Sequence, residues 1–361
     1  MSNNNISRTR PHLKKIVFLP PGRWATNIIA HDPNKTIDET SVQRVLTQQG
    51  IQVITVNPHE KPWNLLSGSN PYFRALDPLR ALKILLIHRN ADAIVVVFES
   101  GGVVLLLLRW LFRFRPKVVL WDASVGNPWR FLAFVQKIVF KRFDGLMMLT
   151  NHQIETLVAR HTIRGRLLHL GYNVDESFFH PKYNAIGNYI LSVGDDRSRD
   201  YDTLLEAIGP LDQFLKLKTR WRSQNTEFTA QIRLEYVSNR LNDMEFRELY
   251  GAARFVVLPL REVDSAGGIT ALFEAMAMGK AVIVTESGVS KDFVTDGLNA
   301  IVVPVGDMQA LRAAMVRLIE NPTLCDTLGR NARAMIDSNF STRNLASQMA
   351  TFITSLAIDQ K

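Results

Sequence analysis

Twelve short apolar runs, rich in β-branched residues, recur along the chain with helical stretches between them. The runs are almost continuously apolar, which is the pattern of parallel strands that helices cover on both faces. The first six are KKIVFLP, IQVITV, AIVVVF, KVVLWD, GLMMLT and RLLHLG, and the second six are YILSVG, FLKLKT, IRLEYV, FVVLPL, AVIVT and AIVVPV. The pattern predicts an α/β fold of two doubly wound, Rossmann-like domains in tandem.

The length agrees with two domains, because 361 residues are too many for one ordinary hydrophobic core. We expect a first domain over residues 1–182 and a second over residues 183–335, joined by the polar stretch HPKYNAIGN. The last helical stretch lies in residues 336–361, and we expect it to pack back toward the first domain. Ligands of such sheets bind at the carboxyl ends of the strands, so site residues are expected in the strand-to-helix turns.

Composition indicates a cytoplasmic protein. The single cysteine, Cys325, leaves no internal disulfide, and the first fifteen residues are polar and basic without the apolar run of a secretory signal. The most apolar region, residues 94–115, is interrupted by Glu99, two glycines and Arg109. This predicts a strand, a turn and a helix rather than a membrane span.

The formal charge of +9 is carried by the first half of the chain. Residues 1–182 hold 24 Lys and Arg against 12 Asp and Glu, whereas residues 183–361 hold 19 against 22. Either one domain meets an anionic surface or substrate, or the excess is a solvated basic face.

Helix boundaries are readable at several places. Asp77 is expected to cap a helix that begins at Pro78, and Asn321 with Pro322 is expected to end another. Gly279 is the expected left-handed cap of the helical stretch ITALFEAMAMG.

The turn before that helical stretch predicts a diphosphate site. Gly267 and Gly268 bring no Cβ atoms to a place where a ligand would approach the backbone, and the amides of Ile269 and Thr270 follow. Unpaired amides at the positive end of a helix bind phosphate groups. Glu274 lies about one turn deeper. Its carboxylate either accepts hydrogen bonds from the hydroxyls of a ribose, or answers the helix dipole or caps a neighbouring amide.

The segment LPLREVDSAGGITALFEAMAMGKAVIVTESG resembles the donor-site segment of glycosyltransferase family 4, the retaining glycosyltransferases of group 1 with GT-B fold. Three more segments are similar to the family and stand in family order: HLGYNVDESFFHP, YILSVGDDRSRDYDTLLEAI and DGLNAIVVPVGDMQALRAAM. The family pattern has a second glutamate eight positions before Glu274, where this chain has Ala266. The contact of that carboxylate with the donor sugar is made instead by Asp264, Glu262 or backbone groups, or this sugar does not require it.

The resemblance implies a GT-B fold with a C-terminal crossover helix and a retaining, metal-independent hexosyltransferase. Its donor would be a nucleotide-sugar, bound as a substrate, and its acceptor a hydroxyl of a glycan or lipid-linked glycan in cell-surface polysaccharide synthesis. It also implies that Arg197 and Arg199 grip the donor phosphates while Gly194 closes their turn; the alternative is that both arginines pair with neighbouring aspartates. The expected donor-binding residues are Gly194, Arg197, Arg199, Ser265, Gly267, Gly268, Ile269, Thr270 and Glu274.

The resemblance assigns the acceptor to the first domain. Gly22 and Arg23 follow the first strand in FLPPGRW and belong to the expected acceptor-side loop. Asp122 and Glu99 end two neighbouring runs, where a carboxylate either orients or deprotonates an acceptor hydroxyl or serves only as a cap, as Ser124 also can.

A basic stripe is predicted on a helix over residues 129–143. Arg130, Lys137 and Lys141 fall within about 40° of one another at helical spacing, and aromatic residues occupy other faces. The helix either lies on an anionic membrane, peripheral to the inner face of the plasma membrane, or is a core helix with one solvated face.

Other functions fit the sequence less well. A nucleotide-sugar epimerase or a phosphorylase on the same fold is one alternative, but no lysine context points to a pyridoxal cofactor. A basic nucleic-acid-binding protein is another, although no nucleic-acid motif is present. We expect no metal, since none of the eight histidines has metal-site spacing and the adjacent acids of GDDRSRD point in different directions.

Overall fold

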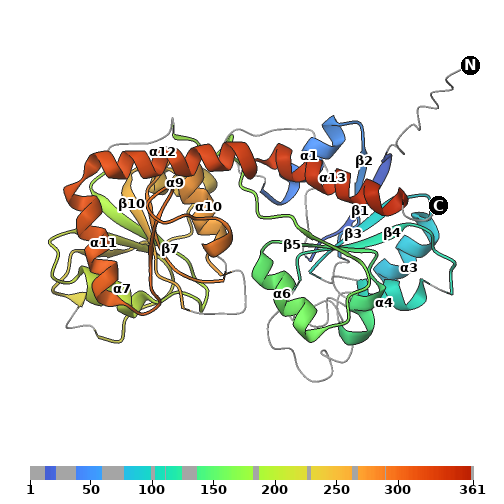
Figure 1. Cartoon of the computed structure of the whole chain (residues 1–361), viewed down its shortest axis with the longest axis horizontal. Coiled ribbons are helices and arrows are strands. Elements are labelled where there is room, and N and C mark those ends of the chain that lie inside the picture. The colour runs from blue at the N-terminus through green and yellow to red at the C-terminus, as the bar shows by residue number, and fades with distance from the viewer. Residues whose placement is uncertain are drawn as a thin grey trace, which may run out of the picture.

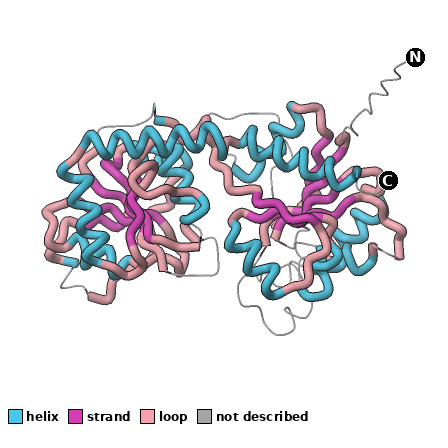
Figure 2. The backbone as a smooth tube through the Cα atoms, in the orientation of Figure 1, coloured by secondary structure: helices cyan, strands magenta, loops and turns pink. Residues whose placement is uncertain are grey.

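The computed structural model describes residues 13–21, 38–58, 77–98, 102–109, 111–123, 136–181, 187–225, 229–261, 267–288 and 290–358. Two six-stranded parallel sheets form the cores of two lobes, and helices cover the faces of both sheets (Figure 1, Figure 2). Each of the twelve apolar runs coincides with or overlaps one strand, so the predicted fold class is confirmed.

The first sheet and its helices form the N-terminal lobe, with the strand order β2-β1-β3-β4-β5-β6. One face packs against α1 (Asp38–Gln48), and the other packs against α3 (Pro78–Ile87), α4 (Gly102–Leu108) and α6 (Asn151–Arg160). The strands are β1 (Lys15–Leu19), β2 (Gln52–Thr55), β3 (Ala93–Val97), β4 (Lys117–Trp121), β5 (Gly145–Met148) and β6 (Arg166–His169).

The second sheet and its helices form the C-terminal lobe, with the order β12-β11-β10-β7-β8-β9. One face packs against α7 (Tyr201–Ile208) and α11 (Met308–Glu320), and the other against α9 (Asp243–Gly251) and α10 (Ile269–Ala277). The strands are β7 (Tyr189–Val193), β8 (Phe214–Lys218), β9 (Leu234–Tyr236), β10 (Ala253–Leu258), β11 (Val282–Thr285) and β12 (Ile301–Val303).

The helix boundaries predicted from capping residues are confirmed. The Asp77 side chain accepts a hydrogen bond from the Arg80 amide at 3.0 Å, and Pro78 begins α3. Asn321 ends α11 and caps α12 (Pro322–Asn339). Gly279 has φ +65°, which an L-residue adopts only with strain, and it follows the end of α10.

Helices α12 and α13 (Thr342–Ile358) run across the two lobes along one side of the molecule (Figure 1). The last helix packs against α1, β4 and β5, and the Arg166 guanidinium on β6 donates to the Ser355 hydroxyl at 3.0 Å. This is the crossover helix of the predicted fold. The expected domain limit after residue 335 lies inside α12, and the one after residue 182 lies outside the described residues.

The predicted α-helix over residues 129–143 is not continuous. Its described part has an α-helical turn from Gln136 to Val139, and the 3₁₀ helix η1 (Phe140–Arg142) follows. Phe140 and Phe143 are both buried, and a 3₁₀ helix brings side chains three residues apart onto the same face. The segment thus ends in a 3₁₀ turn, which is frequent at helix ends, and the prediction of one α-helix to Phe143 was wrong.

Candidate functional site

The C-terminal lobe has its topological switch point between β7 and β10, where the strand order reverses. The helix after β7, α7, packs on one face of the sheet, and the helix after β10, α10, packs on the other. Open α/β sheets bind ligands where two such turns diverge. The turns are residues 194–200 and 259–268, and the sequence predicts the donor site in these same two segments. Residues 262–266, which include Ser265, lie outside the described residues.

The two turns contact each other through their glycines. A Cβ atom on Gly267 would collide with the Ser198 hydroxyl, and one on Gly268 would lie 2.7 Å from Arg199 Nη1. The Arg261 amide donates to the Ser198 carbonyl at 2.7 Å, which fixes the same contact through the backbone. The two turns can therefore pack against each other only because Gly267 and Gly268 have no Cβ atoms. This requirement is separate from the approach of a ligand to their backbone.

Arg199 and Arg197 have different environments. Arg199 is 7% exposed; its Nε donates to the Val193 carbonyl at 2.8 Å, and its Nη2 lies 3.5 Å from a carboxylate oxygen of Asp196. Its buried Nη1 has no hydrogen-bond partner among the described residues. Arg197 is exposed. The arginine pair thus divides into a buried charge behind the turn and a surface charge beside it.

The two aspartates of this turn are occupied by local hydrogen bonds. Asp195 accepts from the Arg220 amide at 2.5 Å and from the Thr219 hydroxyl at 3.2 Å. Partial burial raises the pKa of Asp195, but these hydrogen bonds and the Arg220 charge outweigh it, so that the pKa is lowered. Asp196 accepts from the amide and the hydroxyl of Ser198. Within the described residues, no cluster of His, Cys, Asp and Glu could hold a metal ion.

Helix α10 begins directly at this contact. Gly268 is its N-cap with φ +87°, and the helical residues Ile269 and Thr270 follow, so their amides lie at the positive end of the helix. The Thr270 hydroxyl is 3.1 Å from the hydroxyl of Tyr172, which lies in the segment after β6. The sequence did not indicate Tyr172.

Glu274 is buried in the second turn of α10, at 7% exposure. Its Oε2 accepts a hydrogen bond of 2.7 Å from the hydroxyl of Tyr250, near the end of α9. Burial and then the neighbouring carboxylate raise the pKa of Tyr250 well above its ordinary value, so the hydroxyl stays a donor. Since Glu274 lies beyond the first turn, the helix dipole has little effect on it. Tyr250 is a site residue that no sequence motif marked.

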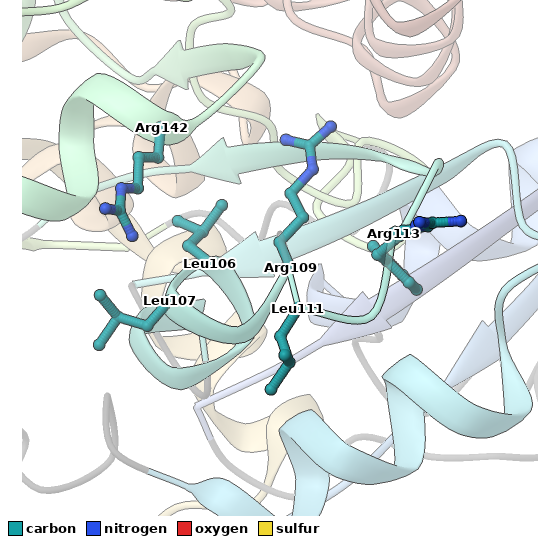
Figure 3. A pocket seen from close by; sticks show the side chains of 7 residues that line it. Leu106, Leu107, Arg109, Leu111, Arg113 and Arg142 are labelled. Atoms are coloured by element: carbon teal, nitrogen blue, oxygen red, sulfur yellow. The ribbon is translucent and has the colours of Figure 1, made fainter.

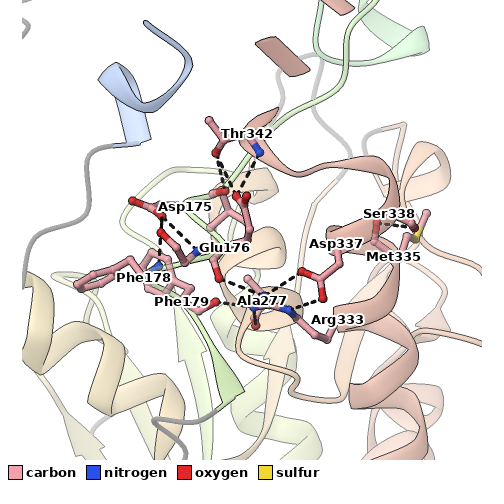
Figure 4. Close-up of polar contacts among 12 residues, drawn as sticks. Asp175, Glu176, Phe178, Phe179, Ala277, Arg333, Met335, Asp337, Ser338 and Thr342 are labelled. Carbon is pink, nitrogen blue, oxygen red and sulfur yellow. Dashed lines mark hydrogen bonds and ion pairs between the residues drawn. The ribbon is translucent and has the colours of Figure 1, made fainter. Parts of the chain in front are cut away.

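The other end of α10 is fixed by Arg333 of α12 (Figure 4). The guanidinium donates to the carbonyls of Ala277 and Phe179, both at 2.7 Å, and to that of Glu176 at 3.1 Å. It also pairs with Asp337 at 2.8 Å. The C-terminal end of helix α10 is therefore anchored to the segment between the lobes.

The N-terminal lobe has its own switch point, between β1 and β3. Gly22, Arg23 and Glu99 follow these two strands in the sequence, but all three lie outside the described residues. Asp122 follows β4 and is described: it is 5% exposed and has φ +60°, a strained backbone conformation for a residue with a side chain.

The Asp122 carboxylate is held by hydrogen bonds. Its Oδ1 accepts from Gln153 Nε2 at 2.9 Å and from the Ala123 amide at 2.7 Å. Gln153 belongs to the capping box that begins α6, so the carboxylate is tied to a helix start. Burial raises the pKa of Asp122 to about 7, although these hydrogen bonds lower it.

Replacing Asp122 with asparagine is expected to change how stability depends on pH. Because the folded-state pKa lies above the ordinary value of 3.8, the folded chain binds more protons, and its stability falls as pH rises between these two values. Asparagine keeps the Oδ1 acceptor without the charge, so the free energy of unfolding of the variant should not fall in this way. Relative to the parent it should rise by roughly 1 to 4 kcal/mol between pH 5 and pH 8. Thermal unfolding across this range is the measurement, and a constant difference would contradict the expectation.

The lobes also meet at the start of α6. Asp292, the last residue of the 3₁₀ helix η3 (Ser290–Asp292) after β11, accepts from the Asn151 amide at 2.6 Å and from the Asn151 side chain at 2.9 Å. His169 at the end of β6 lies 3.9 Å from the same carboxylate. A carboxylate of one lobe thus stabilises a helix N-terminus of the other.

Residues 188–321 match the family model described as Glycosyl transferases group 1. The matched stretch contains both turns of the switch point and all of α10. Over this stretch the C-terminal lobe is similar to the family. The chain is 24% identical over 242 residues to the MMP alpha-(1->4)-mannosyltransferase of Mycolicibacterium hassiacum, in a match that covers 63% of this chain and 58% of the relative.

A second relative is the lipopolysaccharide core biosynthesis mannosyltransferase LpcC of Rhizobium leguminosarum bv. viciae. It is 24% identical to this chain, in a match that covers 71% of this chain and 76% of the relative. Sucrose-phosphate synthase of Thermosynechococcus elongatus has a similar fold, with a TM-score of 0.74, 17% identity and coverage of 96% of this chain and 100% of its own. Anabaena HepE in complex with UDP also has a similar fold. Its TM-score is 0.67 and its identity 15%, in a match that covers 95% of this chain and 100% of HepE. These structures show the GT-B fold for this chain.

Proposed function

We propose that the chain is a retaining hexosyltransferase that moves a sugar from a nucleoside-diphosphate donor to an acceptor hydroxyl without a metal ion. Both curated relatives described above are named mannosyltransferases. The structure of HepE, which shares the fold, is that of a complex with UDP. These names support a hexose donor carried by a nucleoside diphosphate.

The observation that carries the proposal is the buried charge of Arg199 behind the N-terminus of α10. A guanidinium stays ionised at any working pH, and burying one of its nitrogens without a partner is costly. The cost is offset when an anion lies within reach of its field, and the amides after Gly268 offer such an anion its hydrogen bonds. A donor diphosphate matches both features.

In this proposal each group has a distinct role. The amides of Ile269 and Thr270 bind the diphosphate, Arg199 supplies positive potential from behind, and Arg197 reaches it from the surface. Gly194 has φ +145°, and a Cβ atom there would collide with the Arg199 side chain, so its role is to admit the arginine. Glu274 accepts hydrogen bonds from the ribose. Charge that develops on the departing diphosphate is met by donors already in place.

The N-terminal lobe binds the acceptor in this proposal. A carboxyl group with a pKa of about 7 can exchange a proton with a hydroxyl at neutral pH, which suits Asp122 to orienting or deprotonating the acceptor. The acceptor is a glycan or lipid-linked glycan for a cell-surface polysaccharide, in line with the name of the lipopolysaccharide core relative.

We also propose that the protein works in the cytoplasm, peripheral to the inner face of the plasma membrane. Of the three cations expected to contact the lipid, Lys137 is exposed, Lys141 is half-buried, and Arg130 lies outside the described residues.

The experiment that tests the proposed function is a calorimetric titration of the full chain with UDP, GDP and ADP, followed by their sugars. The nucleotide that binds identifies the donor, and release of the diphosphate from that donor measures turnover. The anomeric configuration of the product, read by proton NMR, tests retention.

A further inference from the structure

Helix α3 is apolar on its solvent side as well as on its core side. Ala81, Ile84 and Leu85 are buried against the sheet, whereas Leu79, Leu82 and Leu86 stand on the opposite side with exposures of 44%, 39% and 55%. At helical spacing these three leucines form one stripe. Ile87, at 62%, extends it. A surface helix ordinarily presents polar residues to water, so this stripe calls for a contact.

Helix α4 extends the same surface, because it packs against α3 on the side of the N-terminal lobe away from the C-terminal lobe (Figure 1). Leu107 and Leu111 are exposed there, by 45% and 64%. They line an open hollow of about 900 Å³ together with Leu106, Phe114 and three arginines (Figure 3). Six of the ten large apolar side chains that the described residues expose belong to this surface, so the residues gather rather than scatter.

The rim of this surface is basic. Of the six Lys and Arg in residues 78–115, Arg80 is buried beside Asp77 and Arg109 pairs with Asp144, so the other four supply the exposed positive charge. Asp92 already accepts hydrogen bonds from the amides of Lys14 and Lys15. Among the described residues the exposed cations around the leucines are Lys83, Arg89, Arg113, Arg115 and Arg142.

We propose that the α3–α4 face, defined as Leu79, Leu82, Leu86, Ile87, Leu107 and Leu111, docks onto the surface of an anionic phospholipid bilayer. Apolar side chains that enter the headgroup region, ringed by Lys and Arg that meet lipid phosphates, are the mark of a protein lying on a membrane. Within the described residues no helix is long and apolar enough to cross a bilayer.

The orientation of α3 connects this face to the acceptor. At the start of α3 the Arg80 guanidinium donates to the carbonyl of Pro20 at 2.8 Å, just after β1. The helix therefore begins at the carboxyl edge of the first sheet, the edge at which the acceptor is expected. The face would hold that edge close to a lipid-linked acceptor. This role in acceptor binding rests on the proposed function, whereas the docking rests on the exposed leucines and the cations around them.

The test is binding of the full chain to vesicles, measured by co-sedimentation. Vesicles of phosphatidylcholine containing phosphatidylglycerol should bind the chain, pure phosphatidylcholine should bind it far less, and high salt should release it. The double variant Arg113→Gln and Arg115→Gln should bind about 30-fold more weakly, since each cation near the surface contributes about five-fold. The double variant Leu82→Gln and Leu86→Gln should lose at least about ten-fold.

The matched control is the double variant Leu298→Gln and Val305→Gln, which changes exposed apolar residues of the C-terminal lobe and should bind as the parent does. All changed side chains are exposed, so thermal unfolding should stay close to that of the parent. No binding to anionic vesicles, or binding that both test variants keep, would overturn the proposal. So would self-association that the leucine variant abolishes, because the face would then bind a second copy. Nucleotide titrations of the same variants separate failure of the docking from failure of the donor site.

Discussion

Replacing Glu274 with alanine is expected to weaken binding of the donor nucleotide by about 10- to 150-fold in a chain that still folds. Hydrogen bonds to a charged group contribute about 1.5 to 3 kcal/mol, and this range converts into that loss of affinity. The carboxylate is buried and oriented by the Tyr250 hydroxyl at 2.7 Å, so no water-exposed group could replace it. Calorimetric titration of parent and variant with the same nucleotide is the measurement.

Tyr250→Phe is the matched control for Glu274. It removes the hydroxyl that orients the carboxylate but leaves the charge, so it should cost about 0.5 to 1.5 kcal/mol, or roughly 2- to 12-fold in affinity. If the alanine variant folds and binds nucleotide as the parent does, Glu274 has no ribose role and serves only as the partner of Tyr250.

Replacing Gly268 with alanine is expected to remove nucleotide binding and to lower the free energy of unfolding by about 2 to 5 kcal/mol. The φ of +87° accounts for about 1 to 2 kcal/mol of strain in a residue with a Cβ atom. The rest comes from overpacking, about 1 to 3 kcal/mol, because that atom would lie 2.7 Å from Arg199 Nη1 and 2.8 Å from a methyl of Leu260. Arg199 cannot easily withdraw, since its Nε is bonded to the Val193 carbonyl.

Gly297→Ala separates strain from collision. Gly297 has φ +71°, close to that of Gly268, but a Cβ atom there would meet nothing within 4 Å. The control should therefore lose only about 1 to 2 kcal/mol and keep full nucleotide affinity. Denaturant unfolding and titration of both variants are the measurements, and equal losses in the two would show that the contact of turn with turn has no energetic role.

The fold was largely readable from local chemistry. Continuous apolar runs are a strong signal for buried parallel strands, and each predicted run overlaps a strand. Capping residues such as Asp77 and the left-handed Gly279 fixed helix ends, because their preference rests on one hydrogen bond or one dihedral angle. Among the described residues, helical spacing failed at the end of the stretch 129–143, where a 3₁₀ helix takes the place of the expected last α-helical turn.

The site was readable in part. The spacing located the glycine turn and Glu274, and the structure brings that turn against the turn of Arg199. The difference between Arg197 and Arg199 could not be foreseen, since side-chain directions in an irregular turn follow no period. Tyr250 could not be foreseen either, because its contact with Glu274 joins helices that are adjacent only in the folded chain.

The central claim is that the switch point of the C-terminal lobe binds a nucleoside diphosphate, and the most direct measurement is calorimetric titration of the unmodified chain with UDP and GDP. We predict saturable binding of one of them at a single site, weakened when Glu274 is changed and unaffected by changes in the α3–α4 face. A correctly folded chain that releases no heat with either nucleotide or with their sugars would contradict the account.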